Sequence, residues 1–273
     1  MTAAGTAVAT PRRTGGPLRS LWAARWLLLQ WVRRDFTVQY RQSALGPLWA
    51  LVQPLSLLVV YGIVFRQVLN VRPPQGSYLA FALCGLVPWT FVASAVTRSV
   101  QSLANAAPII KQVSFPRSVV PLAATGVTVV DLALGTVVLL ATQLVANGRL
   151  HVATLSLVVI YLDLVLVLAA VSVVAALVGA LVRDIRFLIP LVLQVGFIAT
   201  PVMYPRSLVP SRFGWVYDLN PVGRVIEAVR AAVIEGRWPS PALLAGLTLG
   251  GVVLLVAALL YSAAIEDRLP DLL

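Results

Sequence analysis

The chain has 273 residues, of which 59% are hydrophobic and 11% are charged, and its mean hydropathy is +0.91. A typical soluble domain carries about 25% charged residues, so this composition excludes a soluble protein and predicts an all-α integral membrane protein. The net charge of +11 would also suit a nucleic-acid-binding protein, but the arginines cluster beside apolar runs, which indicates contact with anionic membrane lipid and no nucleic acid.

The first 43 residues precede any run long enough to cross a bilayer. Residues 1–17 are rich in small residues and prolines and predict a disordered leader. Residues 18–43 are apolar over 21–32, but this run is too short for a span and contains Arg25. The pattern predicts a cytoplasmic amphipathic interface helix with tryptophans at headgroup depth. Its apolar side comprises Leu18, Trp22, Trp26, Leu29, Phe36 and Tyr40, with Trp31 opposite.

Residues 44–273 contain six apolar runs of the length that membrane spans need. A hydrocarbon core of about 30 Å requires roughly 20 residues of helix, and short polar or proline- and glycine-containing segments separate the runs. The predicted fold is therefore a domain of six transmembrane helices. The spans are expected at residues 47 to 65 or 69, 78–100, 119–145, 151–182, 187–203 and 241–265.

Residues 101–118 form a polar, proline-containing segment between the second and third predicted spans, and they include Lys111, the only lysine in the chain. A phosphate-binding loop of the form GxxxxGK[ST] needs glycines before its lysine, and no glycine lies near Lys111. The chain therefore cannot hydrolyse a nucleotide by that route, so the energy for driven transport must arrive through a water-facing contact with a separate subunit. We predict that residues 101–118 are this coupling loop. The alternative is a connection whose prolines only end the helices.

The distribution of arginines predicts the orientation in the membrane. Seven of the 21 positive charges precede the first span. Positive residues favour the cytoplasmic side, and the first helix usually dominates the choice. We therefore expect a multi-pass protein in which both termini and the coupling loop are cytoplasmic.

Residues 204–239 are too polar to cross the membrane and too apolar for an ordinary loop. Asn220 followed by Pro221 is a typical helix cap and first-turn pair, and apolar residues then recur at helical spacing up to Val233. Glu227 and Arg230 lie three residues apart and are expected to pair on the polar side. We predict re-entrant outer gate helices that cover the outer mouth. The alternative is a surface helix on the outer leaflet.

Two acidic residues, Asp131 and Asp163, fall within predicted spans. An ionised side chain at that depth costs at least about 2.5 to 3.5 kcal/mol, so both are expected to face a tunnel or a partner. A hydrogen bond to a neighbouring helix is the preferred interpretation, and a proton relay is the alternative.

Five stretches of the chain resemble a known family. The stretches are RRDFTVQYRQSALGPLWALVQPLSLLVVYGIVF (33–65), YLAFALCGLVPWTFV (78–92), NAAPIIKQVSFPRSVVPL (105–122), VRDIRFLIP (182–190) and NPVGRVIEAVR (220–230). Together they resemble, in the same order, the motifs of the membrane (permease) subunits of ABC exporters for lipid-linked polysaccharides, the O-antigen and teichoic-acid exporter family. The resemblance extends over nearly all of residues 30–270.

The resemblance implies a homodimer in the bacterial plasma (inner) membrane, carried on two copies of an ATPase subunit that bind ATP and Mg, while this chain holds no catalytic residue, cofactor or metal. The cargo would be an O-antigen, a teichoic acid or a galactan-like glycan. Phe115 would be an apolar knob in a groove of the ATPase. The implied sites are the interface helix, with Arg34, Asp35, Tyr40 and Arg41; the coupling loop, with Asn105, Lys111, Phe115, Pro116 and Arg117; and the outer gate, with Asn220, Pro221, Glu227 and Arg230.

A polysaccharide path needs aromatic faces on which sugar rings stack. The candidates are Trp89, Phe91, Phe197, Tyr204 and Trp215, and the alternative for each is a residue of the interfacial aromatic belt. Among other classes, a membrane transferase would need an acid/base or metal cluster, and a secondary transporter usually shows internal repeats. Neither feature is visible in the sequence. An ABC permease for a drug or small lipid is the alternative within the exporter class.

Overall fold

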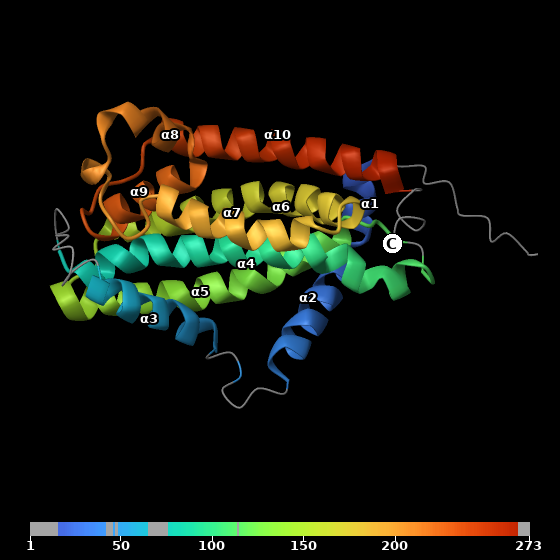
Figure 1. Ribbon diagram of the computed structural model, residues 1–273, viewed down its shortest axis with the longest axis horizontal. Coiled ribbons are helices and arrows are strands. Elements are labelled where there is room, and N and C mark those ends of the chain that lie inside the picture. Colours follow the sequence, from blue (N-terminus) through green and yellow to red (C-terminus); the bar gives the residue numbers. More distant parts are fainter. Residues whose placement is uncertain (1–15, 42–45, 47–48, 65–75, 114, 267–273) are drawn as a thin grey trace, which may run out of the picture.

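The structure is a computed structural model that describes residues 16–41, 46, 49–64, 76–113 and 115–266. The regular elements in these residues are all helices, as predicted. The predicted leader lies almost wholly outside the described residues. Several long helices run side by side along the long axis of the molecule (Figure 1): α4 (Tyr78–Ile110), α5 (Val119–Asn147), α6 (Leu157–Leu181), α7 (Ile185–Ala199) and α10 (Pro241–Ile265).

Within the described residues, four helical segments are long and apolar enough to cross a membrane. They are α4, α5, α10 and the segment 152–181, which joins the short 3-10 helix η3 (Val152–Ser156) to α6. Each corresponds to one predicted span. The first and fifth predicted spans correspond to shorter helices, α3 (Trp49–Gly62, 14 residues) and α7 (15 residues). Residues 65–75, where the first predicted span ends, lie outside the described residues.

Helix α4 is longer than the predicted span, because it continues through the polar residues after Val100 as far as Ile110. Its 33 residues correspond to about 50 Å of helix, well above a hydrocarbon core of about 30 Å. Pro108 lies in its last turn and does not end it: the Lys111 backbone N–H still bonds to the Ala107 carbonyl at 3.1 Å. Most of the predicted coupling loop is therefore a helical extension, and the expectation of a loop from residue 101 was wrong.

Helix α4 is also the centre of the packing. It contacts α3, α5, α6, α7 and α9 (Pro221–Val233). Two clusters of buried apolar side chains lie along it. The first joins its N-terminal two thirds to α5, α6 and α9, and the second joins its C-terminal end to α2 (Arg25–Tyr40), α5, α6 and α10. Helix α4 therefore contacts both predicted functional regions, which are the coupling loop at its C-terminal end and the outer gate helix α9.

The close approach of α4 and α6 depends on Gly179. A Cβ atom at this position would overlap the backbone carbonyl oxygen of Val100. We expect Gly179→Ala to push the two helices apart and to lower stability by about 1–3 kcal/mol, the usual cost of overpacking. Gly250→Ala in α10 is the matched control, because a Cβ there meets nothing within 4 Å. Thermal unfolding in detergent measures both, and equal melting temperatures would contradict this account of the packing.

The predicted interface helix is two helices, α1 (Pro17–Ala23) and α2, which join at Ala24. The face predicted to be apolar is turned away from the protein: Trp22 and Trp26 are each 70% exposed. Trp31, predicted on the opposite side, is buried against the bundle. The exposed tryptophans remain compatible with headgroup contact, whereas Trp31 attaches the helix to the rest of the chain.

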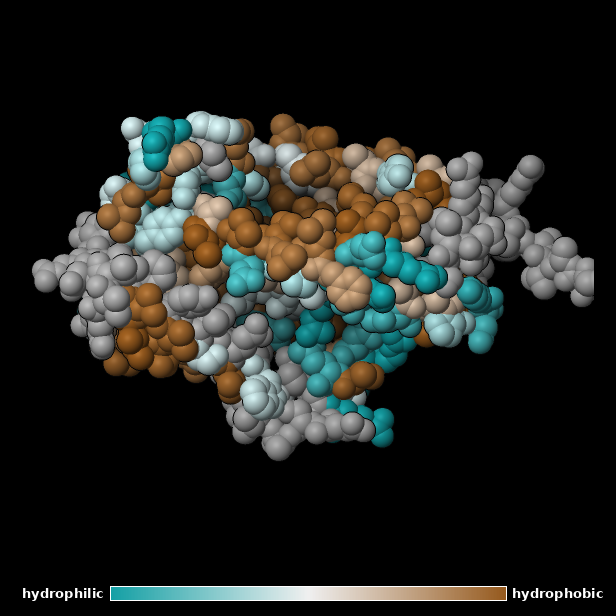
Figure 2. Space-filling model, viewed as in Figure 1, coloured by the Kyte–Doolittle hydropathy of each residue, from teal (hydrophilic) through white to brown (hydrophobic). Residues whose placement is uncertain are grey.

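The two ends of the bundle collect different segments. Helix α1, the C-terminal end of α4 and the last turn of α10 lie at one end, and α8 (Gly214–Leu219) and α9 lie at the other (Figure 1). Exposed apolar side chains cover much of the length between them. Figure 2 shows this band over α7 and α10, with hydrophilic side chains below its right-hand end, beside α2.

Candidate functional site

The aromatic ring of Phe115 is the centre of the coupling segment, residues 101–118. It lies 5.5 Å from the ring of Trp31, measured between centroids, with the two planes tilted by 47°. Phe115 is only 6% exposed. It therefore does not project from the chain as the predicted apolar knob. Instead it packs within the chain and connects the coupling segment to α2.

Arg117 fixes the same segment to two other elements. Its backbone N–H donates to the Glu266 carboxylate, at the end of α10, over 2.9 Å. Its guanidinium donates to the Ile110 carbonyl over 3.0 Å and lies 5.5 Å from the centre of the Phe115 ring. The ends of α4 and α10 and the start of α5 are thereby held together. Pro116, next to Arg117, is half-buried.

The exposed part of the coupling segment is a separate set of residues. Asn105, Lys111, Gln112 and Val113 all face the surface. These side chains, and not the ring of Phe115, are the ones that a separate subunit could touch in this conformation.

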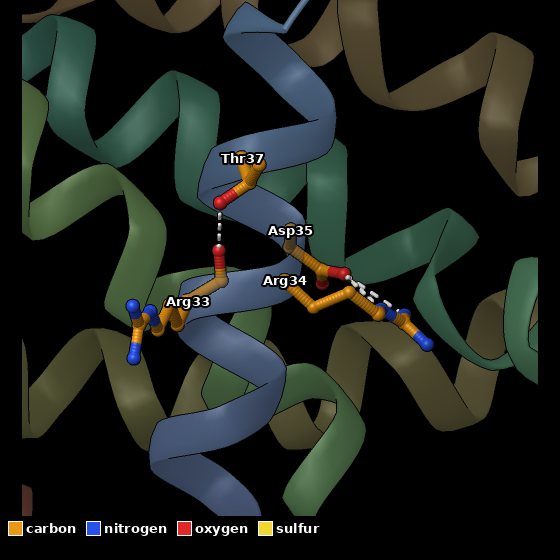
Figure 3. Close-up of polar contacts among 4 residues, drawn as sticks. All are labelled: Arg33, Arg34, Asp35 and Thr37. Carbon is orange, nitrogen blue, oxygen red and sulfur yellow. Dashed lines mark hydrogen bonds and ion pairs between the residues drawn. The ribbon is translucent and has the colours of Figure 1, made fainter.

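The polar side of α2 carries an ion pair beside the aromatic contact. The Arg34 guanidinium lies 2.8 Å from the Asp35 carboxylate and 4.1 Å from the centre of the Trp31 ring. Figure 3 shows this pair on one side of the helix and Arg33 on the other, with the Thr37 hydroxyl donating to the Arg33 carbonyl. Arg41 is exposed at the end of the helix. The side chain of Tyr40, which was also predicted to contribute, lies outside the described residues.

At the other end of the bundle, residues 200–239, here called the outer segment, turn back into the protein. Thr200, Val202 and Met203 are each at most 1% exposed. The Tyr78 hydroxyl donates to the Met203 carbonyl over 3.2 Å. The backbone at Val202 lies so close to α4 that a Cβ atom at Gly85 would overlap its carbonyl oxygen. The outer segment continues through η4 (Arg206–Leu208), η5 (Ser211–Phe213), α8 and α9.

Asn220 caps α9 as predicted. Its Oδ1 accepts hydrogen bonds from the backbone N–H groups of Val222 and Gly223, at 3.0 and 3.2 Å, and Pro221 occupies the first helical position. Its Nδ2 also donates to the Thr200 hydroxyl over 2.8 Å. One side chain therefore connects the start of α9 to the buried turn at the start of the outer segment.

The predicted pair of Glu227 and Arg230 does not form, because each side chain has another partner. Glu227 pairs with Arg206 at 3.7 Å. Arg230 is 7% exposed, lies 3.8 Å from the centre of the Phe81 ring, and donates to the Val202 carbonyl over 2.6 Å. The helical spacing contained this signal, because Arg230 follows Ile226 by four residues and therefore lies at the edge of the apolar face.

The two acids at membrane depth have different surroundings. Asp163 is 4% exposed, and its Oδ1 accepts a hydrogen bond from the Thr248 hydroxyl of α10 over 2.6 Å. This contact confirms the expected hydrogen bond to a neighbouring helix. Asp131 is half-buried in α5. Within the described residues, no three histidine, cysteine, aspartate or glutamate side chains gather where they could hold a metal ion.

The predicted sugar-stacking aromatics are brought together only in part. The rings of Trp89 and Phe197 meet edge to face at 5.9 Å. The Tyr204 hydroxyl lies 2.9 Å from that of Tyr217, and Trp215 is 65% exposed. Phe91 is 1% exposed in the protein core, which leaves no face of its ring for a sugar in this conformation.

The apolar bundle with polar segments at both ends is that of a multi-pass membrane protein. The chain belongs to the ABC-2 type transporter family, which its residues 27–234 match. The family inferred from the sequence motifs is thus confirmed.

Several curated proteins are similar to the chain over most of its length. An O-antigen export system permease protein RfbA of Klebsiella pneumoniae is 30% identical over 214 residues, which cover 77% of this chain and 81% of the relative. An RfbA protein of Myxococcus xanthus with the same description is 29% identical over 256 residues, covering 92% and 95%. The polysialic acid transport protein KpsM of Escherichia coli is 25% identical over 210 residues, covering 74% and 79%.

Proposed function

We propose that this chain is the membrane subunit of an ATP-driven exporter that moves a lipid-linked polysaccharide out of the cytoplasm. The observation that carries the proposal is the match to O-antigen export permeases over up to 92% of the chain. The KpsM relative is also named for transport of a polysaccharide. These names favour a polysaccharide cargo over a drug or small lipid.

The finer membrane topology is part of the proposal. Six spans result if α3, continued by the residues that follow it, and α7 cross together with the four long segments. The arginine distribution orients both termini to the cytoplasm, in the bacterial plasma (inner) membrane. The gathering of α1, the coupling segment and the end of α10 at one end of the bundle supports this orientation, because all of them belong to the predicted cytoplasmic side.

The chain works in this proposal as a homodimer carried on two ATPase subunits, which bind ATP and Mg. The exposed residues of the coupling segment, Asn105, Lys111 and Gln112, would touch the ATPase. The buried contact of Phe115 with Trp31 would pass the resulting movement to α2, and α4 would carry it along the bundle. Phe115 thus keeps a role in coupling, but as an internal connection and not as a knob.

The outer segment, in the same proposal, closes the path on the far side of the membrane. Support comes from its burial against α4: the backbone at Val202 and Met203 is held by Arg230 and Tyr78, and Asn220 holds Thr200.

The test is reconstitution of the chain with its ATPase in lipid nanodiscs, followed by measurement of ATP hydrolysis. Addition of a defined lipid-linked polysaccharide should raise the rate several-fold, whereas a hydrophobic drug or a short phospholipid should not. Stimulation by the drug alone would replace the proposal with the permease for small molecules.

A further inference from the structure

A groove of about 480 Å³ lies between α2, α4 and α5 near the coupling segment. Polar side chains of α2 and α4 line it, among them Arg34, Asp35, Arg98 and Gln101, and Trp31 and Val38 add apolar surface on the α2 side. Val120, Ala124 and Val127 of α5 form an apolar floor. We call this space the Arg98 groove. Its combination of polar walls and an apolar floor suits an amphiphile.

The charge in the Arg98 groove is concentrated on one side chain. Asp35 neutralises Arg34 through their 2.8 Å ion pair. Arg98 is half-buried and makes no hydrogen bond or ion pair with another described residue. A half-buried guanidinium without a counterion is unfavourable unless a ligand supplies one. A phosphate group fits this requirement, since guanidinium and phosphate form two parallel hydrogen bonds.

The depth of the groove indicates where this phosphate comes from. Arg98 lies 20 residues after Tyr78 in α4, which corresponds to about 30 Å of helix, the thickness of a hydrocarbon core. With Tyr78 near the outer boundary, Arg98 reaches the inner headgroup layer. The floor residues of α5 extend over roughly 10 Å of helix beside Arg98, with Val127 on the side of the membrane centre, so an apolar chain attached to the phosphate has a surface to follow.

We propose that the Arg98 groove binds the phosphorylated headgroup of the lipid that carries the glycan, with the phosphate on Arg98 and the start of the lipid chain against Val120, Ala124 and Val127. This inference rests on the proposed function, because it assigns a site to the lipid part of that cargo. The Gln101 amide, on the same face of α4, supplies a further donor.

The test uses the chain assembled with its ATPase in nanodiscs of neutral lipid and farnesyl diphosphate as the probe, with binding measured by calorimetry. We expect the wild type to bind farnesyl diphosphate, and Arg98→Gln to weaken binding at least about tenfold. Arg98→Lys should lose less than Arg98→Gln, because it retains the charge. Gln101→Glu should weaken binding as strongly as Arg98→Gln, since it adds a negative charge at an exposed position that folding tolerates. Arg149→Gln, an exposed arginine beyond the other end of α5, is the matched control and should change nothing.

Three results would overturn the assignment. Equal affinity of the wild type, Arg98→Gln and Gln101→Glu would remove the groove as the site. If inorganic diphosphate binds as tightly as farnesyl diphosphate, the groove is a site for soluble phosphate. If farnesyl diphosphate no longer binds in nanodiscs of phosphatidylglycerol, the groove makes a general contact with anionic lipid. If farnesyl diphosphate binds through Arg98 but a lipid-linked glycan does not stimulate hydrolysis, the proposed function fails while the site stands.

Discussion

Replacement of Phe115 with aspartate is expected to abolish export and to leave the chain inserted in the membrane. The ring is 6% exposed and packs on Trp31, so the substitution places a carboxylate among apolar side chains, where burial of a charge is strongly unfavourable. The coupling segment should detach from α2, and movement of the ATPase should no longer reach the bundle. Export of the glycan to the cell surface, compared with the amount of protein in the membrane, measures the effect.

Two variants control this experiment. Leu150→Asp places the same charge on a side chain that is 44% exposed in the connection between α5 and η3, and export should remain within about twofold of the wild type. Phe115→Leu keeps an apolar side chain and should retain most of the activity. Unchanged export in Phe115→Asp would remove the coupling role of this contact.

Arg230→Ala is expected to release the start of the outer segment. The substitution removes the hydrogen bond to the Val202 carbonyl and the contact with the Phe81 ring. A hydrogen bond from a charged group contributes about 1.5–3 kcal/mol, and a desolvated cation–π contact about 2 kcal/mol. Local opening of residues 200–205 should therefore become at least several hundredfold more frequent, on the order of 400-fold for the smaller values. Hydrogen exchange of this segment measures the change, and export should fall with it.

Arg224→Ala is the matched control, because it removes an exposed arginine from the same helix. It should leave hydrogen exchange at residues 200–205 unchanged. If Arg230→Ala exchanges no faster than Arg224→Ala, Arg230 does not hold the outer segment in place.

Several elements could be predicted from the sequence because a local signal marks each end. Helix α10 begins at Pro241 and ends at Ile265, as expected. Helix α9 begins at the predicted Asn220 cap and Pro221. Helix α5 ends at Asn147, before Gly148, which adopts the left-handed conformation with φ of 69°. In each case a capping residue, a proline or a glycine acts within a few residues of the boundary.

The remaining features depend on contacts between distant segments. Hydropathy shows where the apolar part of a helix ends, but the helix itself can continue through polar residues. The extension of α4 to Ile110 was therefore missed. Trp31 was assigned away from the apolar face because its partner, Phe115, lies 84 positions further along the chain. The contact of Arg230 with Val202 and Phe81 likewise requires the folded arrangement.

Helix α4 connects the two regions on which the proposed mechanism depends. Its C-terminal end at Ile110 accepts a hydrogen bond from Arg117 in the coupling segment. Its N-terminal part, at Tyr78 and Gly85, holds the outer segment. A continuous helix of about 50 Å therefore joins the two ends of the bundle.

The most direct test of the account is a transport assay in proteoliposomes that contain either the chain alone or the chain with its ATPase. The amount of lipid-linked glycan that becomes accessible to a glycan-cleaving enzyme on the opposite face gives the extent of transport. We predict transport that requires both ATP and the ATPase, and none by the chain alone. Transport of the glycan by the chain without the ATPase would contradict the account.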